Sequence, residues 1–113
     1  MEKIVHLCQR QQWEAARRVG VYRPASLESE GFIHCSRPEQ IGKVAQRFYR
    51  QLPDLVLLWI DPPRVQPKIR WEAADGETFP HIYGPLNLDA VIAIQEYDVE
   101  SGKLFPPDMA PVI

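Results

Sequence analysis

Three histidines are the side chains in this sequence best suited to proton transfer or hydrogen bonding near neutral pH. His6, His34 and His81 all lie on or beside short apolar segments that we expect to form β-strands. A histidine in such a setting is more often a hydrogen-bonded structural residue than a catalyst. The three histidines together are a stronger indication of a functional site than any one of them, because neighbouring strands could bring all three to one cleft.

Further polar side chains would complete such a cleft, namely Tyr22, Ser36, Glu72 and Tyr83. Together they would supply hydrogen-bond donors and one carboxylate, which suits a polar ligand. Glu72 has a simpler interpretation as an exposed carboxylate paired with Arg70 on the same strand face. The segment 79–86 predicts a rigid loop that presents His81 and Tyr83 on one side, or else a packed strand at a sheet edge.

Several other chemistries are disfavoured. His34 and Cys35 would point to opposite faces of a strand, and no C-x-x-C or H-E-x-x-H spacing is present, so we expect no metal site. Cys8 and Cys35 are predicted to be reduced, buried and inert. Ser36 lacks a G-x-S-x-G elbow, and its spacing to Glu39 predicts a helix-capping role instead. Without a G-x-G-x-x-G or P-loop motif, no tightly bound nucleotide cofactor is expected.

The elements that must position these residues follow from hydrophobic periodicity and from the turn residues. Strands are predicted over 3–8, 32–36, 55–60, 68–72 and 89–97, and helices over 9–18 and 36–52, with one helical turn at 26–30. In the strand 32–36, Phe32, His34 and Ser36 would share one face. The apolar stripe of the second helix would run as far as Leu52, and Ile69 and Trp71 would pack inward. Pro80, within 79–86, predicts an edge strand or a loop there.

Composition limits the architecture and the partners. The chain has 113 residues, 45% of them hydrophobic and 25% charged, which indicates one globular domain over 1–113 with a loop tail at 101–113. Eleven prolines, mostly in the second half, exclude long helices there. We therefore expect an α+β fold with two main helices in the N-terminal half and a largely antiparallel sheet, whole or split.

The formal charge of −2 gives no footprint for nucleic acid, and no apolar run approaches the length of a membrane span. The N-terminus lacks the apolar core of a signal peptide. We therefore expect a soluble cytoplasmic protein.

Several segments together resemble the small bacterial family called domain of unknown function 952. The resemblance runs from about residue 3 to residue 97, and its most specific parts are EGFIHCS at 30–36 and FPHIYGPL at 79–86. Further parts are His6, Trp13, 20–22, 26–27, 48–49, 55–58 and 70–72.

The resemblance implies an ADP-ribosylation-like fold, in which a split α+β sheet grips NAD in a cleft. By analogy with transferases of that fold, His6 would hold a ribose, His34 or Ser36 would support the nicotinamide side, and Glu72 would stabilise the oxocarbenium-like centre. Tyr22, Ser36, His81 and Tyr83 would bind the nucleotide, with NAD as a substrate rather than a resident cofactor.

Three functions stay open on the sequence. The first is an NAD-using enzyme that transfers ADP-ribose or hydrolyses NAD. The second is a non-catalytic module that binds a nucleotide or other small ligand in the same cleft. The third is a structural, partner-binding domain, in which the three histidines would be dispersed.

Overall fold

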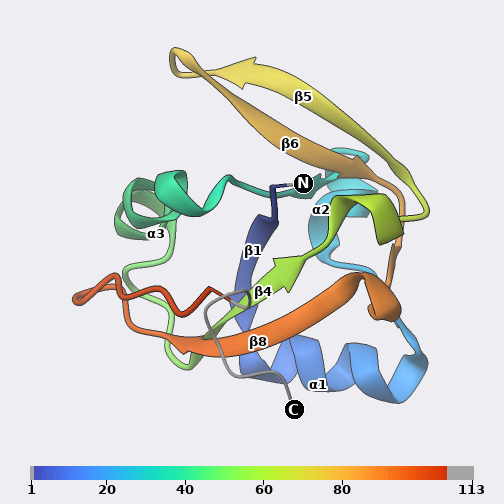
Figure 1. The fold of residues 1–113 in the computed structure, drawn as a ribbon. Coiled ribbons are helices and arrows are strands. Elements are labelled where there is room, and N and C mark those ends of the chain that lie inside the picture. Colours follow the sequence, from blue (N-terminus) through green and yellow to red (C-terminus); the bar gives the residue numbers. More distant parts are fainter. Residues whose placement is uncertain (1, 107–113) are drawn as a thin grey trace.

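The strands of this protein form three antiparallel sheets, seen in the computed structural model of Figure 1, which describes residues 2–106. The first sheet has the order β1–β4–β8, with β1 at Ile4–Gln9, β4 at Leu55–Ile60 and β8 at Val91–Tyr97. The second has the order β3–β6–β5, with β3 at Ile33–His34, β5 at Lys68–Ala74 and β6 at Glu77–Tyr83. A two-stranded sheet pairs β2 at Val21–Tyr22 with β7 at Leu86–Asn87. The predicted α+β class with antiparallel sheets is confirmed.

The central strand β4 is buried along its whole length, as its continuous apolar sequence predicts. It pairs with β1 from Leu55 opposite Gln9 to Ile60 opposite Ile4, and its other edge pairs with β8. Both faces of β4 therefore need a covering layer. Figure 1 shows β1 and β4 running between the β5–β6 hairpin on one side of the molecule and β8 on the other.

The two faces of this first sheet carry separate hydrophobic cores. On one face, Val5, Leu57 and Trp59 pack with Ile41 and Ala45 of helix α3, which spans Ile41–Phe48. The other face carries a larger cluster that joins α1, at Arg10–Val19, to the β3–β6–β5 sheet; it includes Ile4, Trp13, Ile33, Leu58 and Ile82.

The N-terminal helix α1 begins and ends as its sequence predicts, within one residue. The backbone N–H of Gln9 donates to the side-chain oxygen of Gln12, which caps the first turn. Gly20 ends the helix in the left-handed region at φ 96°, where a glycine costs least. The short helix α2, at Ala25–Ser29, confirms the predicted helical turn.

Helix α3 differs from the prediction at both ends. The capping residue is Arg37 rather than Ser36: the Arg37 N–H donates to the Gln40 side chain at 2.8 Å, before a 3₁₀ turn at Pro38–Gln40. The helix stops at Phe48, whose exposed fraction is 63%, and Leu52 is 43% exposed. The apolar stripe is thus longer than the face of the sheet that it covers, and its last members lie outside the core.

Strand β6 is the central strand of the second sheet, so the predicted edge position of the segment 79–86 is wrong for its first half. Pro80 is tolerated because its carbonyl accepts the Cys35 N–H at 3.1 Å. The N–H and C=O of one residue point to the same side of a strand, so the missing donor of Pro80 faces the segment after β3, not the ladder with β5.

The hairpin of β5 and β6 turns at Asp75 and Gly76, as predicted, with φ values of 51° and 80°. Trp71 departs from the prediction, since 51% of it is exposed. Its face of β5 lies at the edge of the sheet, beyond the core that buries Ile82, and the Arg37 guanidinium sits over its ring at 5.7 Å.

Strand β3 is also shorter than the predicted strand at 32–36. Ser36 pairs separately with Val5, through an isolated bridge that connects the second sheet to the first.

Two further 3₁₀ turns, at Pro62–Arg64 and Leu88–Ala90, precede β5 and β8. Residues 101–106 form the irregular end of the described chain, and the rest of the predicted tail lies outside the described residues. None of the helices in the described part is long and apolar enough to cross a bilayer.

Candidate functional site

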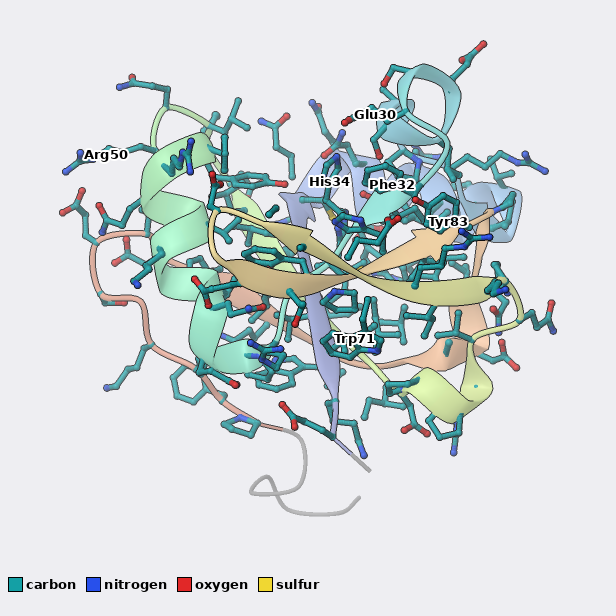
Figure 2. The ribbon with its side chains drawn as sticks, turned by 90° about the horizontal axis from the view of Figure 1, so that it is seen from above. Glu30, Phe32, His34, Arg50, Trp71 and Tyr83 are labelled. Carbon is teal, nitrogen blue, oxygen red and sulfur yellow. The ribbon has the colours of Figure 1, made fainter. Side chains whose placement is uncertain are left out.

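A cavity of about 730 Å³ lies between α3 and the β3–β6–β5 sheet, and we call it the histidine cavity. Its lining includes two imidazoles, a buried hydroxyl and several aromatic rings: Glu30, Phe32, His34, Ser36, Val44, Phe48, Tyr49, Ala74, Asp75, Phe79 and His81. The volume falls within the range of small-molecule sites. In Figure 2, Glu30, Phe32, His34 and Tyr83 gather in one region of the molecule, whereas Arg50 projects outward elsewhere.

Strand register places two histidines side by side in this cavity. His34 on β3 pairs directly with His81 on β6, and cross-strand partners put their side chains on the same face. Their ring centroids are 5.4 Å apart with planes at 70°. Phe32, two residues before His34, stacks on His81 at 4.2 Å with an interplanar angle of 18°. The two imidazoles therefore stand on one wall, held by an aromatic neighbour.

Glu72 adjoins the cavity through His81. Its Oε1 accepts the His81 Nδ1–H at 2.8 Å and the Tyr83 O–H at 2.5 Å. These hydrogen bonds, first that of Tyr83 and then that of His81, lower the pKa of Glu72, and the Tyr83 pKa rises in turn. Glu72 is thus ionised at neutral pH.

The bond to Glu72 also fixes the tautomer of the neutral His81 ring. With Nδ1 carrying the donated proton, Nε2 of neutral His81 bears the lone pair, and it has no partner among residues 2–106.

The alternative pairing of Glu72 with Arg70 does not form. No carboxylate oxygen of the described residues lies within 4.0 Å of the Arg70 guanidinium, which instead sits over the Tyr83 ring at 5.2 Å. Arg70 is near enough for its charge to help lower the pKa of Glu72.

His34 has a carboxylate partner of its own. Its Nε2 lies 2.9 Å from Oε2 of Glu30, four residues earlier at the end of the α2 region. About half of each side chain is exposed, 48% for His34 and 50% for Glu30. Gly31, at φ 89°, makes the turn that brings Glu30 back over His34.

His6 lies beneath this wall rather than in it. Its Nδ1–H donates to the backbone carbonyl of His34 at 2.6 Å, and its Nε2 accepts the Tyr22 O–H at 2.7 Å. Only 5% of His6 is exposed, and burial lowers its pKa to about 4. Both ring nitrogens are therefore occupied, and the ring is neutral above that pH.

The seven residues singled out from the sequence divide into three groups. His34, Ser36 and His81 line the cavity. Glu72 and Tyr83 contact His81 from beside it. His6 and Tyr22 are buried behind His34. The three histidines are thus connected rather than dispersed.

The sequence did not single out Glu30, Phe32, Phe79 or the residues of α3 that line the cavity. Three of these left a signal in the sequence. Phe32 was expected to share a strand face with His34 and Ser36. Phe79 alternates with His81 and Tyr83, and a period of two places it on the same strand face. Glu30 precedes His34 by four residues, but only the turn at Gly31 brings the two side chains together. The contribution of α3 depends on tertiary packing that local patterns do not encode.

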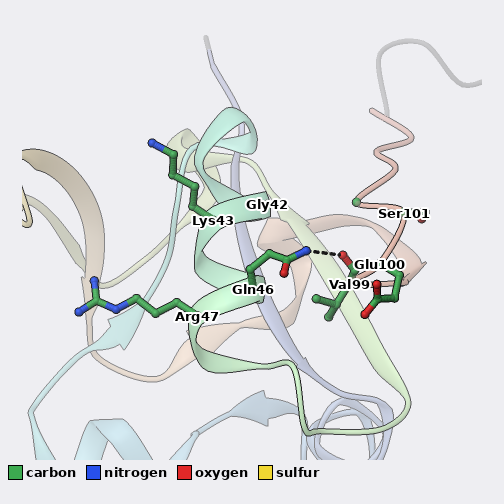
Figure 3. A pocket seen from close by; sticks show the side chains of 8 residues that line it. Gly42, Lys43, Gln46, Arg47, Val99, Glu100 and Ser101 are labelled. Carbon is green, nitrogen blue, oxygen red and sulfur yellow. Dashed lines mark hydrogen bonds between the residues drawn. The ribbon is translucent and has the colours of Figure 1, made fainter.

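A second cavity, of about 460 Å³, lies between α3 and residues 99–102 and has a less reactive lining. Figure 3 shows Gln46 reaching across to donate to the Val99 carbonyl, at 3.2 Å, while Lys43 and Arg47 extend away from that segment. No histidine lines it, so the histidine cavity is the better candidate for chemistry.

Metal and thiol chemistry find little support in the described residues. Among them, no group of three or more His, Cys, Asp or Glu side chains is placed to hold a metal ion. Cys8 and Cys35 are buried and free, and burial raises the pKa of Cys8 to about 11 and that of Cys35 further. Both thiols stay protonated at neutral pH, which fits a packing role.

Comparison with known proteins places this chain in a family. No functionally curated protein matches it. The crystal structure of protein CC0527 from Caulobacter crescentus matches with a TM-score of 0.79 and 33% identity, over 85% of this chain and 86% of that one. The solution NMR structure of CC0527 matches with a TM-score of 0.73 at the same 33% identity, over 87% of this chain and 86% of that one. Residues 7–94 match the family described as protein of unknown function DUF952, and the chain belongs to that family.

Proposed function

We propose that this chain is an NAD-using enzyme with an ADP-ribosylation-like fold, which cleaves the bond between nicotinamide and ribose in the histidine cavity. ADP-ribose would pass to water or to an acceptor. The observation that carries this proposal is the pair of His34 and His81 on the wall of an aromatic-lined cavity, with the ionised Glu72 bonded to His81 from beside the cavity. An aromatic lining with a few convergent polar groups suits a nucleotide ring.

The chemistry follows from these positions. As the bond from the ribose C1′ to nicotinamide breaks, its electron pair leaves with nicotinamide and positive charge develops on the ribose. A water oxygen then bonds to C1′, and His81 Nε2 accepts the proton that the water loses. Glu72 holds His81 in the tautomer that can accept this proton, and its negative charge stabilises both the imidazolium and the ribose cation. The products are nicotinamide, ADP-ribose and one proton.

The other residues take supporting roles in this proposal. His34 and Ser36 contact the ligand from β3 and the segment after it, and Tyr83 keeps Glu72 in place. His6 and Tyr22 position the His34 backbone rather than touch substrate, because the hydrogen bonds of His6 are already made.

Nicotinamide release from NAD tests the proposal. Glu72→Gln keeps the shape and removes the charge, so we expect binding of ADP-ribose to stay within about twofold while release slows about 100-fold or more. Glu96→Gln, with an 84% exposed side chain on β8, is the matched control and should release nicotinamide as the wild type does. The proposal is excluded if NAD and ADP-ribose at millimolar concentration produce no heat of binding and no shift in melting temperature.

A non-catalytic module that binds the same ligands is the second candidate. One observation favours it: Glu72 does not line the cavity, and its Oε1 is already engaged by two hydrogen bonds. Turnover separates the two functions. Binding of NAD with no nicotinamide released over hours would establish the module and exclude the enzyme.

A further inference from the structure

Two cations extend the row of polar side chains that begins at the histidine cavity. In the ladder between β5 and β6, Arg70 pairs with His81, and Lys68 pairs with Tyr83. Direct partners share a face, so both cations stand on the cavity side of the sheet, on its edge strand β5. His34, His81 and Arg70 thus form one continuous row across the three strands.

The Arg70 guanidinium lies against an aromatic ring, but its hydrogen-bond donors are unused. Its Cζ lies over the Tyr83 ring at 5.2 Å from the centroid, a cation–π contact, and no residue in the described part of the chain accepts a hydrogen bond from the guanidinium or pairs with it within 4.0 Å. Glu72, the nearest candidate partner along the strand, is bonded to Tyr83 and His81 instead. Both Arg70 and Lys68 are exposed, so a ligand can reach them.

An exposed guanidinium with unused donors is well suited to bind a phosphate group. Its planar fork matches the oxygens of a phosphate, and the contact with the Tyr83 ring keeps the guanidinium on the cavity side of the sheet. A ring in the cavity would stand against His34, Phe32 and His81, and a phosphate bonded to it through a sugar would extend along the row toward Arg70.

We propose that Arg70, assisted by Lys68, forms an anion subsite that binds a phosphate or diphosphate group of the ligand whose ring occupies the histidine cavity. The inference rests on the proposed function for the identity of that ring. It adds the position of the ligand's phosphates, which lie over the edge strand β5 against Arg70 and Lys68.

Calorimetric titration with inorganic pyrophosphate, ADP-ribose and adenosine tests the subsite. Arg70→Gln should weaken pyrophosphate and ADP-ribose about 10-fold, the loss expected for a charge-assisted hydrogen bond, and leave adenosine within about twofold. Arg70→Lys keeps the charge but not the planar fork, so its affinity for pyrophosphate should lie between those of the wild type and Arg70→Gln. Arg18→Gln, an exposed residue on α1, makes the same change in net charge and should leave all three affinities unchanged.

Two outcomes would overturn the subsite: unchanged pyrophosphate binding in Arg70→Gln, or an equal loss in Arg18→Gln. Because Arg70 is exposed, the variant should fold, and its melting temperature confirms this. The failures are distinguishable. Nicotinamide release that is insensitive to Arg70→Gln in both KM and kcat would contradict the subsite alone. Arg70-dependent binding of ADP-ribose without any nicotinamide release would contradict the enzyme alone.

Discussion

At the scale of single residues, His6 shows how a side chain that looks catalytic can serve the structure. Its ring is neutral and buried, with one nitrogen donating to the His34 carbonyl and the other accepting from Tyr22. A bond of this kind fixes the backbone from which His34 projects. Removal of one partner would leave a buried polar group unsatisfied, which costs about 1–3 kcal/mol.

The lowered pKa of His6 predicts an acid-sensitive fold. Its value of about 4 in the folded chain lies below the ordinary 6.5, so the unfolded chain binds more protons between these values. The free energy of unfolding should be unaffected by His6 above pH 6.5 and should then fall by roughly 3 kcal/mol as the pH drops to about 4. Urea unfolding at a series of pH values measures this loss.

The matched comparison uses variants of His6 and His34. With His6→Gln, the free energy of unfolding should fall less as the pH drops, whereas His34→Gln, which replaces an exposed ring, should leave the pH dependence as in the wild type. An NMR titration of the wild-type His6 ring gives the same answer without a variant. A midpoint near 6.5 would contradict the buried, neutral state.

At the scale of elements, the hairpin of β5 and β6 depends on its turn. Asp75 and Gly76 both have positive φ, the geometry that matches the twist of two-residue hairpin turns. The turn fixes the register that sets His81 opposite Arg70 and, across the diagonal, near Glu72.

Alanine substitutions at two glycines, Gly76 and Gly42, test this turn, because only Gly76 of the two has a positive φ. Gly76→Ala forces a side chain into the left-handed region at φ 80° and should lower the free energy of unfolding by about 1 kcal/mol. Gly42→Ala, within α3 and with no atom within 4 Å of the added Cβ, should raise it by about 0.5–1 kcal/mol. Urea unfolding of both variants gives the comparison; equal shifts in the same direction would refute the assigned turn.

Local sequence patterns predicted which helices and strands form better than they predicted where these elements begin and end. The apolar run of β4 and the glycine after α1 predicted a buried strand and a helix end, because each depends on the chain nearby. The end of α3 and the position of β6 depend on what packs against them. Pro80 predicted an edge strand, yet it lies in the central strand β6. The ladder between β3 and β6 ends at His81, so no hydrogen bond of that ladder requires the N–H that Pro80 lacks.

At the scale of the whole molecule, the candidate site is a product of long-range packing. Period-two alternation put His34 and Ser36 on one face, and the same rule joins His81 to Tyr83, so much of one wall could be predicted. The opposite wall, from Val44, Phe48 and Tyr49 of the α3 region, could not. The hydrogen-bond partner of His6 also could not be predicted, because it requires β2 to bring Tyr22 over β1.

Amide chemical shifts of the labelled chain, followed during titration with ADP-ribose, test the central claim most directly, since they locate the ligand. The account predicts saturable shifts centred on His34, Phe79 and His81, and none at Gly42, Glu100 and Ser101 of the second cavity. Shifts centred on the second cavity, or no shifts at millimolar ligand, would contradict it.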